Sequence, residues 1–259
     1  MASRTKARAA RPARVTLNCL AHAGAGVASY RDWASAVGDG VDVHALPLPG
    51  REARRREPRL TTRADLLADL LPGLLTTARR GPYALYGHSM GALVGYTLTR
   101  ALADAGAPPL FLAVGACPPP HTTTALVDGA DLPDEDLLPL LDTIGSLPPG
   151  ASASPGGLWR RTFLPVLRDD LRLAKSLRNA ALDPVTGGPV DVPVLVFAGS
   201  DDPLAAPAAL RHWQQWTTDL IELHTVSGGH FFASSAGLAQ HVGRACRDHV
   251  NAQPAGGRR

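Results

Sequence analysis

Tyr83-Ala84-Leu85-Tyr86-Gly87-His88-Ser89-Met90-Gly91-Ala92 begins as a short apolar strand, passes through Gly-x-Ser-x-Gly and continues into a helical pattern. This order is typical of a nucleophile elbow, in which the serine occupies a sharp, strained turn between a strand and a helix. Side chains that flank such a turn collide unless they are very small, so the turn needs Gly87 and Gly91. We predict that Ser89 is a nucleophile whose Oγ stands clear above a sheet. The alternative is a glycine-rich turn with an incidental serine.

The serine requires a base that takes its proton and an acid that orients the base. In the α/β-hydrolase fold these follow the serine in the order acid, then histidine. Two later strands each end beside a residue of the required type. The strand that starts at Val192 runs into a loop that carries Asp202, and the strand 220–226 is followed by His230. We therefore predict Ser89, Asp202 and His230 as the catalytic residues.

Two backbone N–H groups stabilise the negative oxygen of the reaction in this fold. Met90 follows the serine and begins the helix, whose N-terminus carries partial positive charge. The second donor comes from the loop after the first strand, here Ala21-His22-Ala23-Gly24-Ala25-Gly26. We expect the oxyanion hole to consist of the N–H groups of Ala23 and Met90. The alternative for this loop is an ordinary turn between a strand and a helix.

Composition limits the classes of protein to which the chain can belong. Its 259 residues suit one α/β domain. A net charge of +3, few aromatic residues and no basic stripe argue against nucleic-acid binding. Three scattered cysteines favour a reducing compartment over a disulfide framework, and no apolar run is long enough to cross a bilayer. We expect a cytoplasmic monomer with no cofactor, no metal and no membrane contact.

Strands alternate with helices along most of the chain, which predicts a mostly parallel central sheet flanked by helices. We place a single α/β-hydrolase domain at 14–250, between disordered tails at 1–13 and 251–259. The alternation stops between 118 and 183. Two helices are expected there, at 134–144 and at 158–177 with Pro165 inside the second, joined by a linker rich in Gly, Pro and Ser. We interpret this segment as a helical lid inserted over the active site.

The sequence resembles the stand-alone, or type II, thioesterases that accompany polyketide and nonribosomal-peptide synthetases, and it does so from about Val15 to His249. The motifs that carry the resemblance are Cys19-Leu20-Ala21-His22-Ala23-Gly24, Leu48-Pro49-Gly50-Arg51-Glu52, the elbow, Leu164-Pro165-Val166-Leu167-Arg168-Asp169-Asp170, Trp213 and Gly229-His230-Phe231-Phe232. The resemblance implies an α/β-hydrolase related to the medium-chain thioesterase of fatty acid synthesis. It also implies the same triad. Two departures are an Ala-Gly-Ala-Gly loop where the family has Ala-Gly-Gly, and a missing serine in Val114-Gly115-Ala116-Cys117-Pro118.

Other residues compete for the roles of base and acid. His22 lies in the oxyanion loop, His88 adjoins the nucleophile but points away from its Oγ, and His224 lies within a strand, so only His230 follows the final strand. Asp201 remains an alternative to Asp202, although the spacing Gly-x-x-Asp from Gly199 selects Asp202.

Three further groups of charged or metal-binding residue types have a plain alternative each. Arg51, Arg54, Arg55 and Arg56 form a basic patch, which we interpret equally as a solvated loop or as a docking site for an acidic carrier protein. His241, Cys246 and His249 lie on one expected helix without a fourth ligand, which favours a solvated face over a metal site. The acidic run at 131–136 suits the N-terminal turn of a helix.

These observations favour a thioester hydrolase that acts on acyl groups tethered by phosphopantetheine to an acyl or peptidyl carrier protein. Editing of aberrant acyl groups and product release both remain open. A carboxylester hydrolase of the same fold, acting on free small molecules, is the first alternative. A binding module with a vestigial triad is the second, and the intact Ser89, Asp202 and His230 argue against it.

Overall fold

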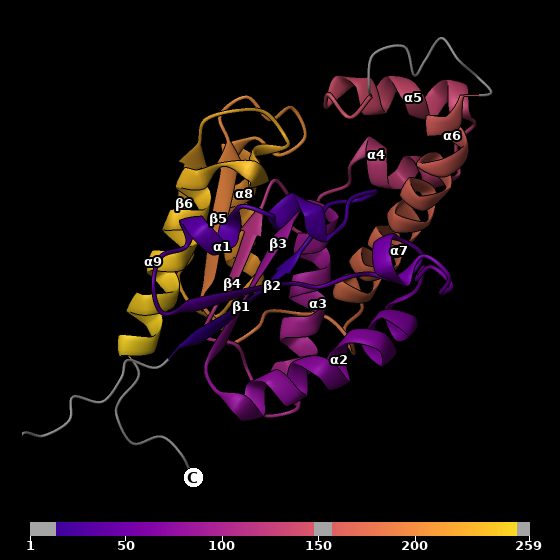
Figure 1. Ribbon diagram of the computed structural model, residues 1–259. Coiled ribbons are helices and arrows are strands. Elements are labelled where there is room, and N and C mark those ends of the chain that lie inside the picture. The colour runs from indigo at the N-terminus through magenta and orange to yellow at the C-terminus, as the bar shows by residue number, and fades with distance from the viewer. Residues whose placement is uncertain (1–13, 148–156, 253–259) are drawn as a thin grey trace, which may run out of the picture.

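The computed structural model describes residues 14–147 and 157–252, and its centre is a six-stranded sheet in which every pair of neighbours is parallel. The strand order is β2-β1-β3-β4-β5-β6 (Figure 1). The strands are β1 Val15–Leu20, β2 Val41–Ala45, β3 Tyr83–His88, β4 Leu112–Gly115, β5 Val194–Gly199 and β6 Glu222–Val226. The direction in which strands are added reverses beside β1, and ligands bind at the carboxyl ends of strands near such a reversal.

Helices cover both faces of the sheet. The α-helices are α1 Trp33–Ala36, α2 Arg63–Arg80, α3 Met90–Asp104, α4 Ala125–Asp128, α5 Asp134–Thr143, α6 Leu158–Thr162, α7 Leu164–Leu182, α8 Pro207–Leu210 and α9 Ala236–Ala252. One buried cluster joins α2, α3 and α7 to one face, and a second joins α1 and α9 to the other. This arrangement confirms the predicted α/β-hydrolase fold.

Alternate residues of a strand enter opposite clusters. In β3, Leu85 packs with the first cluster and Tyr86 with the second, as the two-residue repeat of a strand requires. Because both faces are covered, all six residues of β3 are buried. This explains why the strands before the elbow and before Asp202 are apolar runs without an alternating polar face.

The segment 118–183 contributes α4 to α7, which share a hydrophobic cluster of their own. The prediction of one helix over 158–177 with Pro165 inside was wrong. The chain forms two helices, and Pro165 lies in the first turn of α7. Proline has no N–H and its ring clashes with the preceding helical turn, so it is favoured in the first turn of a helix, and within a helix, as at Pro72 in α2, it removes a hydrogen bond.

The predicted boundaries at the two ends and in the linker can be compared only in part. α9 extends to Ala252, past the end we predicted for the domain at 250. The predicted tails at 1–13 and beyond 252, and most of the linker in the lid, lie outside the described residues. No helix among the described residues is long and apolar enough to cross a membrane.

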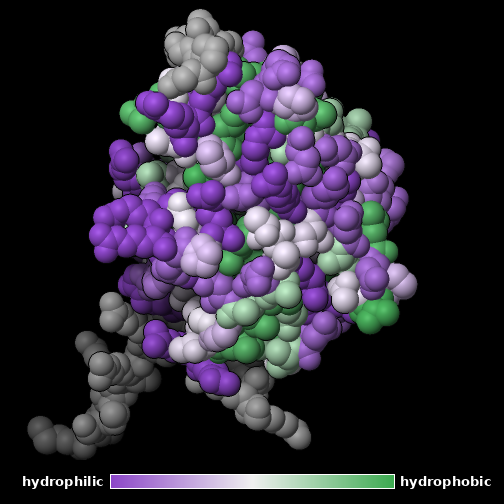
Figure 2. All heavy atoms as spheres, turned by 90° about the vertical axis from the view of Figure 1, so that its right-hand side faces the viewer, coloured by the Kyte–Doolittle hydropathy of each residue, from purple (hydrophilic) through white to green (hydrophobic). Residues whose placement is uncertain are grey.

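The face of the molecule that carries α2 and α7 is largely hydrophilic, with hydrophobic residues scattered among the polar ones (Figure 2). Many leucines of the insertion instead point inward: Leu137, Leu141 and Leu167 are nearly inaccessible to solvent. Leu132, Leu158 and Leu182 are the exceptions and are exposed. The insertion is therefore a packed layer with its own small core.

Candidate active site

Ser89 lies at the junction of β3 and α3 with φ 53° and ψ −121°, a backbone conformation that non-glycine residues rarely adopt. A β-carbon at Gly87 would overlap the backbone of Gly91, and one at Gly91 would overlap the carbonyl of Leu20. Both glycines are thus required by close backbone approach, as the sequence predicted. The turn presents the serine at the N-terminus of a 15-residue helix.

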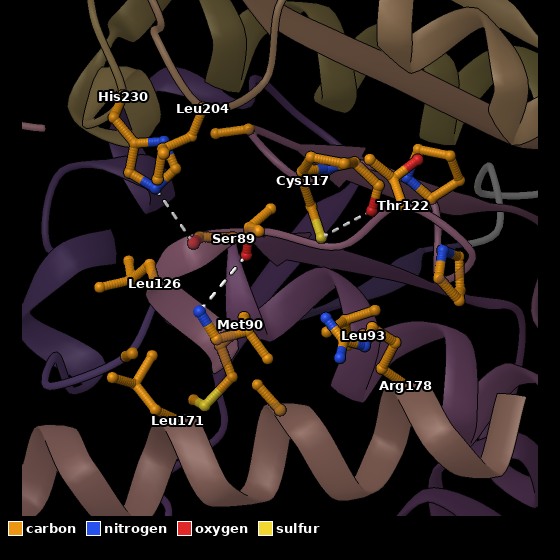
Figure 3. A pocket seen from close by; sticks show the side chains of 18 residues that line it. Ser89, Met90, Leu93, Cys117, Thr122, Leu126, Leu171, Arg178, Leu204 and His230 are labelled. Carbon is orange, nitrogen blue, oxygen red and sulfur yellow. Dashed lines mark hydrogen bonds between the residues drawn. The ribbon is translucent and has the colours of Figure 1, made fainter. Parts of the chain in front are cut away.

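Ser89, His230 and Asp202 form one hydrogen-bonded chain. His230 Nε2 lies 3.0 Å from Ser89 Oγ, and His230 Nδ1 lies 2.9 Å and 3.1 Å from the two carboxylate oxygens of Asp202 (Figure 3 draws the first contact). A carboxylate accepts only, so Nδ1 carries the proton and Nε2 is free to accept the serine O–H. The side chains of His230 and Asp202 are almost fully buried. This arrangement can activate a hydroxyl for attack on a carbonyl carbon.

The structure separates Asp202 from its competitor Asp201. Asp202 also accepts the backbone N–H groups of Leu204 and Ala205, so its carboxylate is fixed toward His230. Asp201 is exposed and accepts the hydroxyl of Ser200. The spacing from Gly199 therefore selected the residue that contacts His230.

The other candidate histidines do not contact the serine oxygen. His88 is fully buried, with Nδ1 2.9 Å from the Tyr86 hydroxyl and Nε2 2.7 Å from the carbonyl oxygen of His230. Since that carbonyl only accepts, His88 donates from Nε2 and supports the backbone of His230. His224 stacks on Phe197 in the sheet.

His22 lies beside the triad, with its ring centroid 5.0 Å from that of Phe231 and 5.9 Å from that of His88. Burial, followed by the charge of His230, lowers the pKa of His22 to about 4. His88 is affected in the same direction: burial lowers its pKa well below the usual 6.5. Both rings are therefore neutral at neutral pH, whereas His230 is paired with the carboxylate of Asp202.

A buried ion pair fixes the loop that contains Ala23, and the sequence alone did not reveal it. Asp170, on α7, accepts the backbone N–H of Gly24 at 2.7 Å and the Arg51 guanidinium at 2.8 Å and 2.5 Å. Arg51 also donates to the carbonyl oxygen of Ala25 at 2.9 Å. The two side chains are 8% and 1% exposed. The only signal in the sequence was that both residues fall within motifs of the resemblance.

The basic patch predicted around Arg51 is largely absent as a free surface. Arg51 is in the buried pair, and Arg54 pairs with Glu57 and with Asp69 at 2.6 Å. Of the four arginines in the patch, Arg55 and Arg56 are exposed, and neither side chain forms an ion pair within residues 14–147 and 157–252. Any docking role of this loop must therefore rest on those two residues.

Glu52, next to Arg51, supports the same loop from the other side. Its carboxylate accepts the backbone N–H groups of Val27 at 3.0 Å and Ala28 at 3.4 Å. Glu52 has a positive φ of 47°, an uncommon conformation that these contacts hold in place. The Arg51-Glu52 motif is thus a clamp on the loop after β1.

Ser89 and His230 line a cavity of about 50 Å³, which extends from the triad to α7 (Figure 3). Ala23 and Met90 both line it, which is where the predicted oxyanion donors need to lie. Most of the remaining lining is apolar, including Leu93, Leu126, Leu171 and Leu204.

Cys117 also lines the cavity. Burial raises the pKa of its thiol to about 12, so this cysteine is not an alternative nucleophile at neutral pH.

No cluster of three or more potential metal ligands occurs within residues 14–147 and 157–252. The expected solvated face was wrong for one of the three residues on α9: Cys246 is fully buried in the core, and the rings of His241 and His249 pack on Phe197 and Phe111.

Comparison with known proteins gives consistent matches over nearly the whole chain. A family model described as a thioesterase domain matches residues 15–249. A probable anguibactin biosynthesis thioesterase, AngT of Vibrio anguillarum, is 28% identical over 81% of this chain and 82% of its own length. RedJ, a thioesterase from the prodiginine biosynthetic pathway of Streptomyces coelicolor, is 32% identical, with 92% of this chain and 90% of RedJ covered and a TM-score of 0.77.

YbtT, described as a type II thioesterase from the yersiniabactin nonribosomal peptide synthetase and polyketide synthase pathway, is 26% identical. The match covers 95% of each chain with a TM-score of 0.76. The architecture and the whole length of the domain are thus shared with stand-alone proteins.

Proposed function

The chain belongs to the thioesterase family, and from that premise we propose that it releases acyl groups from the phosphopantetheine arm of an acyl or peptidyl carrier protein. The carrier would belong to a polyketide or nonribosomal-peptide synthase, as the pathways of AngT, RedJ and YbtT suggest. Its role there is to edit, by removing aberrant acyl groups. We place the enzyme in the cytoplasm as a monomer.

The observation that carries the mechanism is the hydrogen-bonded chain from Ser89 through His230 to Asp202. Ser89 Oγ attacks the thioester carbonyl carbon while His230 Nε2 takes its proton. The C–S bond then breaks, and the proton passes from His230 to the leaving thiolate. The acyl group is now attached to Ser89 Oγ as an ester. Water then attacks the ester carbonyl carbon while His230 takes a proton from it. The bond between the acyl carbon and Ser89 Oγ breaks, His230 returns the proton to Oγ, and the free acid departs. Asp202 holds the proton on Nδ1 and stabilises the imidazolium.

The negative oxygen of each tetrahedral intermediate is stabilised by backbone N–H groups. Met90 supplies one at the start of α3, where the helix dipole adds to the effect. Ala23 supplies the other from the loop that Arg51 and Asp170 fix. A donor must be in place before the charge develops, so a clamped loop is favourable for catalysis.

The cavity is lined mostly by apolar side chains, among them Leu93, Leu126 and Leu171, which suits the hydrocarbon part of an acyl group. We propose editing of short acyl units that block a carrier rather than release of a long finished chain.

Labelling of the serine tests the chemistry. A fluorophosphonate should add one adduct to the intact protein, the peptide that contains Ser89 should carry it, and Ser89→Ala should remove both label and activity. Ser35→Ala is the matched control, because Ser35 is exposed and its hydroxyl donates to the nearby carbonyl of Asp32. Labelling of another residue in the wild-type enzyme would contradict the assignment.

Substrate form is tested by comparing one acyl group on a carrier protein and on N-acetylcysteamine. We expect a higher kcat/KM for the carrier, because contacts remote from the reaction contribute binding energy. Faster cleavage of p-nitrophenyl esters than of either thioester would favour a carboxylester hydrolase instead.

A further inference from the structure

The catalytic base lies on a loop whose backbone is held by side chains of other elements. The loop 227–235 joins β6 to α9 and carries His230. The carbonyl oxygen of His230 accepts from His88 Nε2 at 2.7 Å, and the carbonyl oxygen of Ala233 accepts from Trp33 Nε1 at 2.8 Å. His88 lies on β3 and Trp33 begins α1, so these two contacts tie the loop to the sheet and to a helix on one of its faces.

The direction of the hydrogen bond to His230 determines the second partner of His88. Because a carbonyl only accepts, Nε2 carries the proton, and Nδ1 of the neutral ring is an acceptor. The hydroxyl of Tyr86 lies 2.9 Å from Nδ1 and therefore donates to it. Burial lowers the pKa of His88 well below 6.5, so the ring stays neutral. Tyr86, His88 and the carbonyl of His230 thus form one chain in which every donor meets an acceptor.

This chain is built into the interior of the protein. Tyr86 and His88 are two residues apart on β3, so they lie on the same face of the sheet, and both are 0% exposed. β4 leaves room for their contact, since a β-carbon at Gly115 would lie 2.6 Å from the Tyr86 hydroxyl and 3.1 Å from His88 Nδ1. Packing alone would be satisfied by apolar side chains of the same shape, which carry no risk of an unpaired polar group. The polar pair adds a fixed donor on the backbone of the base.

We propose that His88 and Tyr86 are positioning residues for the catalytic base: His88 holds the backbone of His230, and Tyr86 orients the ring of His88. The proposal rests on the catalytic chemistry of the proposed function, in which His230 is the base. His230 Nε2 is 3.0 Å from Ser89 Oγ and Nδ1 is 2.9 Å from Asp202. A displaced backbone would lengthen at least one of these two contacts. Neither positioning residue lines the cavity beside the serine, so the effect falls on catalysis and not on binding of the acyl group.

The test replaces His88 in two ways. His88→Phe keeps a planar ring and removes the donor, whereas His88→Gln places an amide N–H near the position of Nε2. The second-order rate constant for labelling of Ser89 by a fluorophosphonate measures the activated serine without reference to the natural substrate. It should fall about tenfold to a hundredfold in His88→Phe, the range expected when a reacting group is displaced by up to ~1 Å. His88→Gln should recover most of this loss.

Two further readouts separate positioning from a loss of structure. With the butyryl thioester of N-acetylcysteamine, kcat should fall in His88→Phe while KM stays near the wild-type value, because His88 does not line the acyl cavity. The downfield proton resonance of the hydrogen bond between His230 Nδ1 and Asp202 should shift or broaden in His88→Phe and return toward its wild-type position in His88→Gln. A wild-type labelling rate and an unchanged resonance in folded His88→Phe would overturn the proposal.

Tyr86→Phe tests the other end of the chain, and Tyr83→Phe is its matched control on the same strand. The Tyr83 hydroxyl donates to the carbonyl oxygen of Ala107, at the end of β3 remote from Ser89. Tyr86→Phe should slow labelling about two- to tenfold, the equivalent of one neutral hydrogen bond, and Tyr83→Phe should be labelled at the wild-type rate. Equal rates for the two variants would contradict the role of Tyr86. Rapid labelling of wild-type Ser89 without turnover of any acyl thioester would instead contradict the proposed substrate class alone.

Discussion

Asp170→Asn should destabilise the protein far more than a neighbouring surface substitution of the same type. The carboxylate accepts three N–H groups, two from Arg51 and one from Gly24, and is 1% exposed. An asparagine of the same shape keeps one acceptor oxygen but removes the negative charge. Arg51 then remains buried as an unpaired cation, because its own side chain is only 8% exposed.

The magnitude follows from that uncompensated charge. Breaking a buried ion pair by neutralising one partner costs about 3–5 kcal/mol in the free energy of unfolding. At roughly 2–4 °C per kcal/mol for a domain of this size, the melting temperature should fall by about 6–20 °C. Catalysis should suffer too, since Asp170 fixes the N–H of Gly24 beside the proposed donor Ala23.

Urea unfolding and thermal scans measure the first effect, and kcat for a short acyl thioester well below the melting temperature measures the second. The control is Asp169→Asn, one residue earlier on α7. Asp169 pairs with the partly exposed Arg59 and Arg172, and such pairs contribute about 0–1 kcal/mol. A loss below about 1 kcal/mol for Asp170→Asn, or equal losses for both variants, would refute the idea that the buried pair fixes the loop.

Three further results are expected. Asp202→Asn should lower kcat by orders of magnitude, because an amide favours the wrong tautomer of the His230 imidazole. Asp201→Asn should stay near the wild-type rate, and similar kinetics for the two variants would reverse the assignment of the acid. Alanine at Arg55 and Arg56 together should raise KM for an acyl-carrier protein and leave the N-acetylcysteamine thioester unaffected, and an equal change in both substrates would argue against docking there. Burial lowers the pKa of His22 from 6.5 to about 4, so between these pH values the unfolded chain binds a proton that the folded chain does not. The stability that neutral, buried His22 provides is therefore complete above pH 6.5 and is lost as the pH falls toward 4. Between these pH values the unfolding free energy of His22→Gln should fall less steeply than that of the wild type. Equal slopes in urea titrations at several pH values would contradict the lowered pKa of His22.

The parts of the fold and site that could be predicted from the sequence are those set by local rules. Strand, Gly-x-Ser-x-Gly and helix follow one another within ten residues, and steric demands at Gly87 and Gly91 are local. Parallel strands bring their carboxyl ends to one edge, so the order of Ser89, Asp202 and His230 already implied their proximity. Pro165 was misjudged because a proline marks either a kink or a helix start, and only the packing of α6 and α7 decides between them.

Pairings between distant charged residues could not be predicted in the same way. Arg51 and Asp170 are 119 positions apart, and no periodicity connects them. The arginines at 51 and 54–56 looked alike in the sequence, but only Arg51 among these four is buried, since α7 packs against the loop after β1 and Asp170 pairs with its guanidinium. Arg178, which lines the cavity, falls in the same class: on a helix with charged residues at many positions, nothing local distinguishes it from the others.

Several of the motifs that carry the resemblance contact the loop after β1, and these contacts account for its departure from the usual Ala-Gly-Gly. Gly24 has a φ of +79°, and a β-carbon there would overlap the ring of Phe163 between α6 and α7. Ala25 replaces the second glycine, but its φ is not positive and it offers Arg51 only a carbonyl oxygen, so a methyl group is tolerated. The loop therefore depends on one glycine and on the clamp formed by Arg51 and Asp170. Phe163 and Asp170 both come from the inserted segment, so the insertion supports the loop that contains Ala23 and, through Leu126 and Leu171, also lines the cavity beside Ser89.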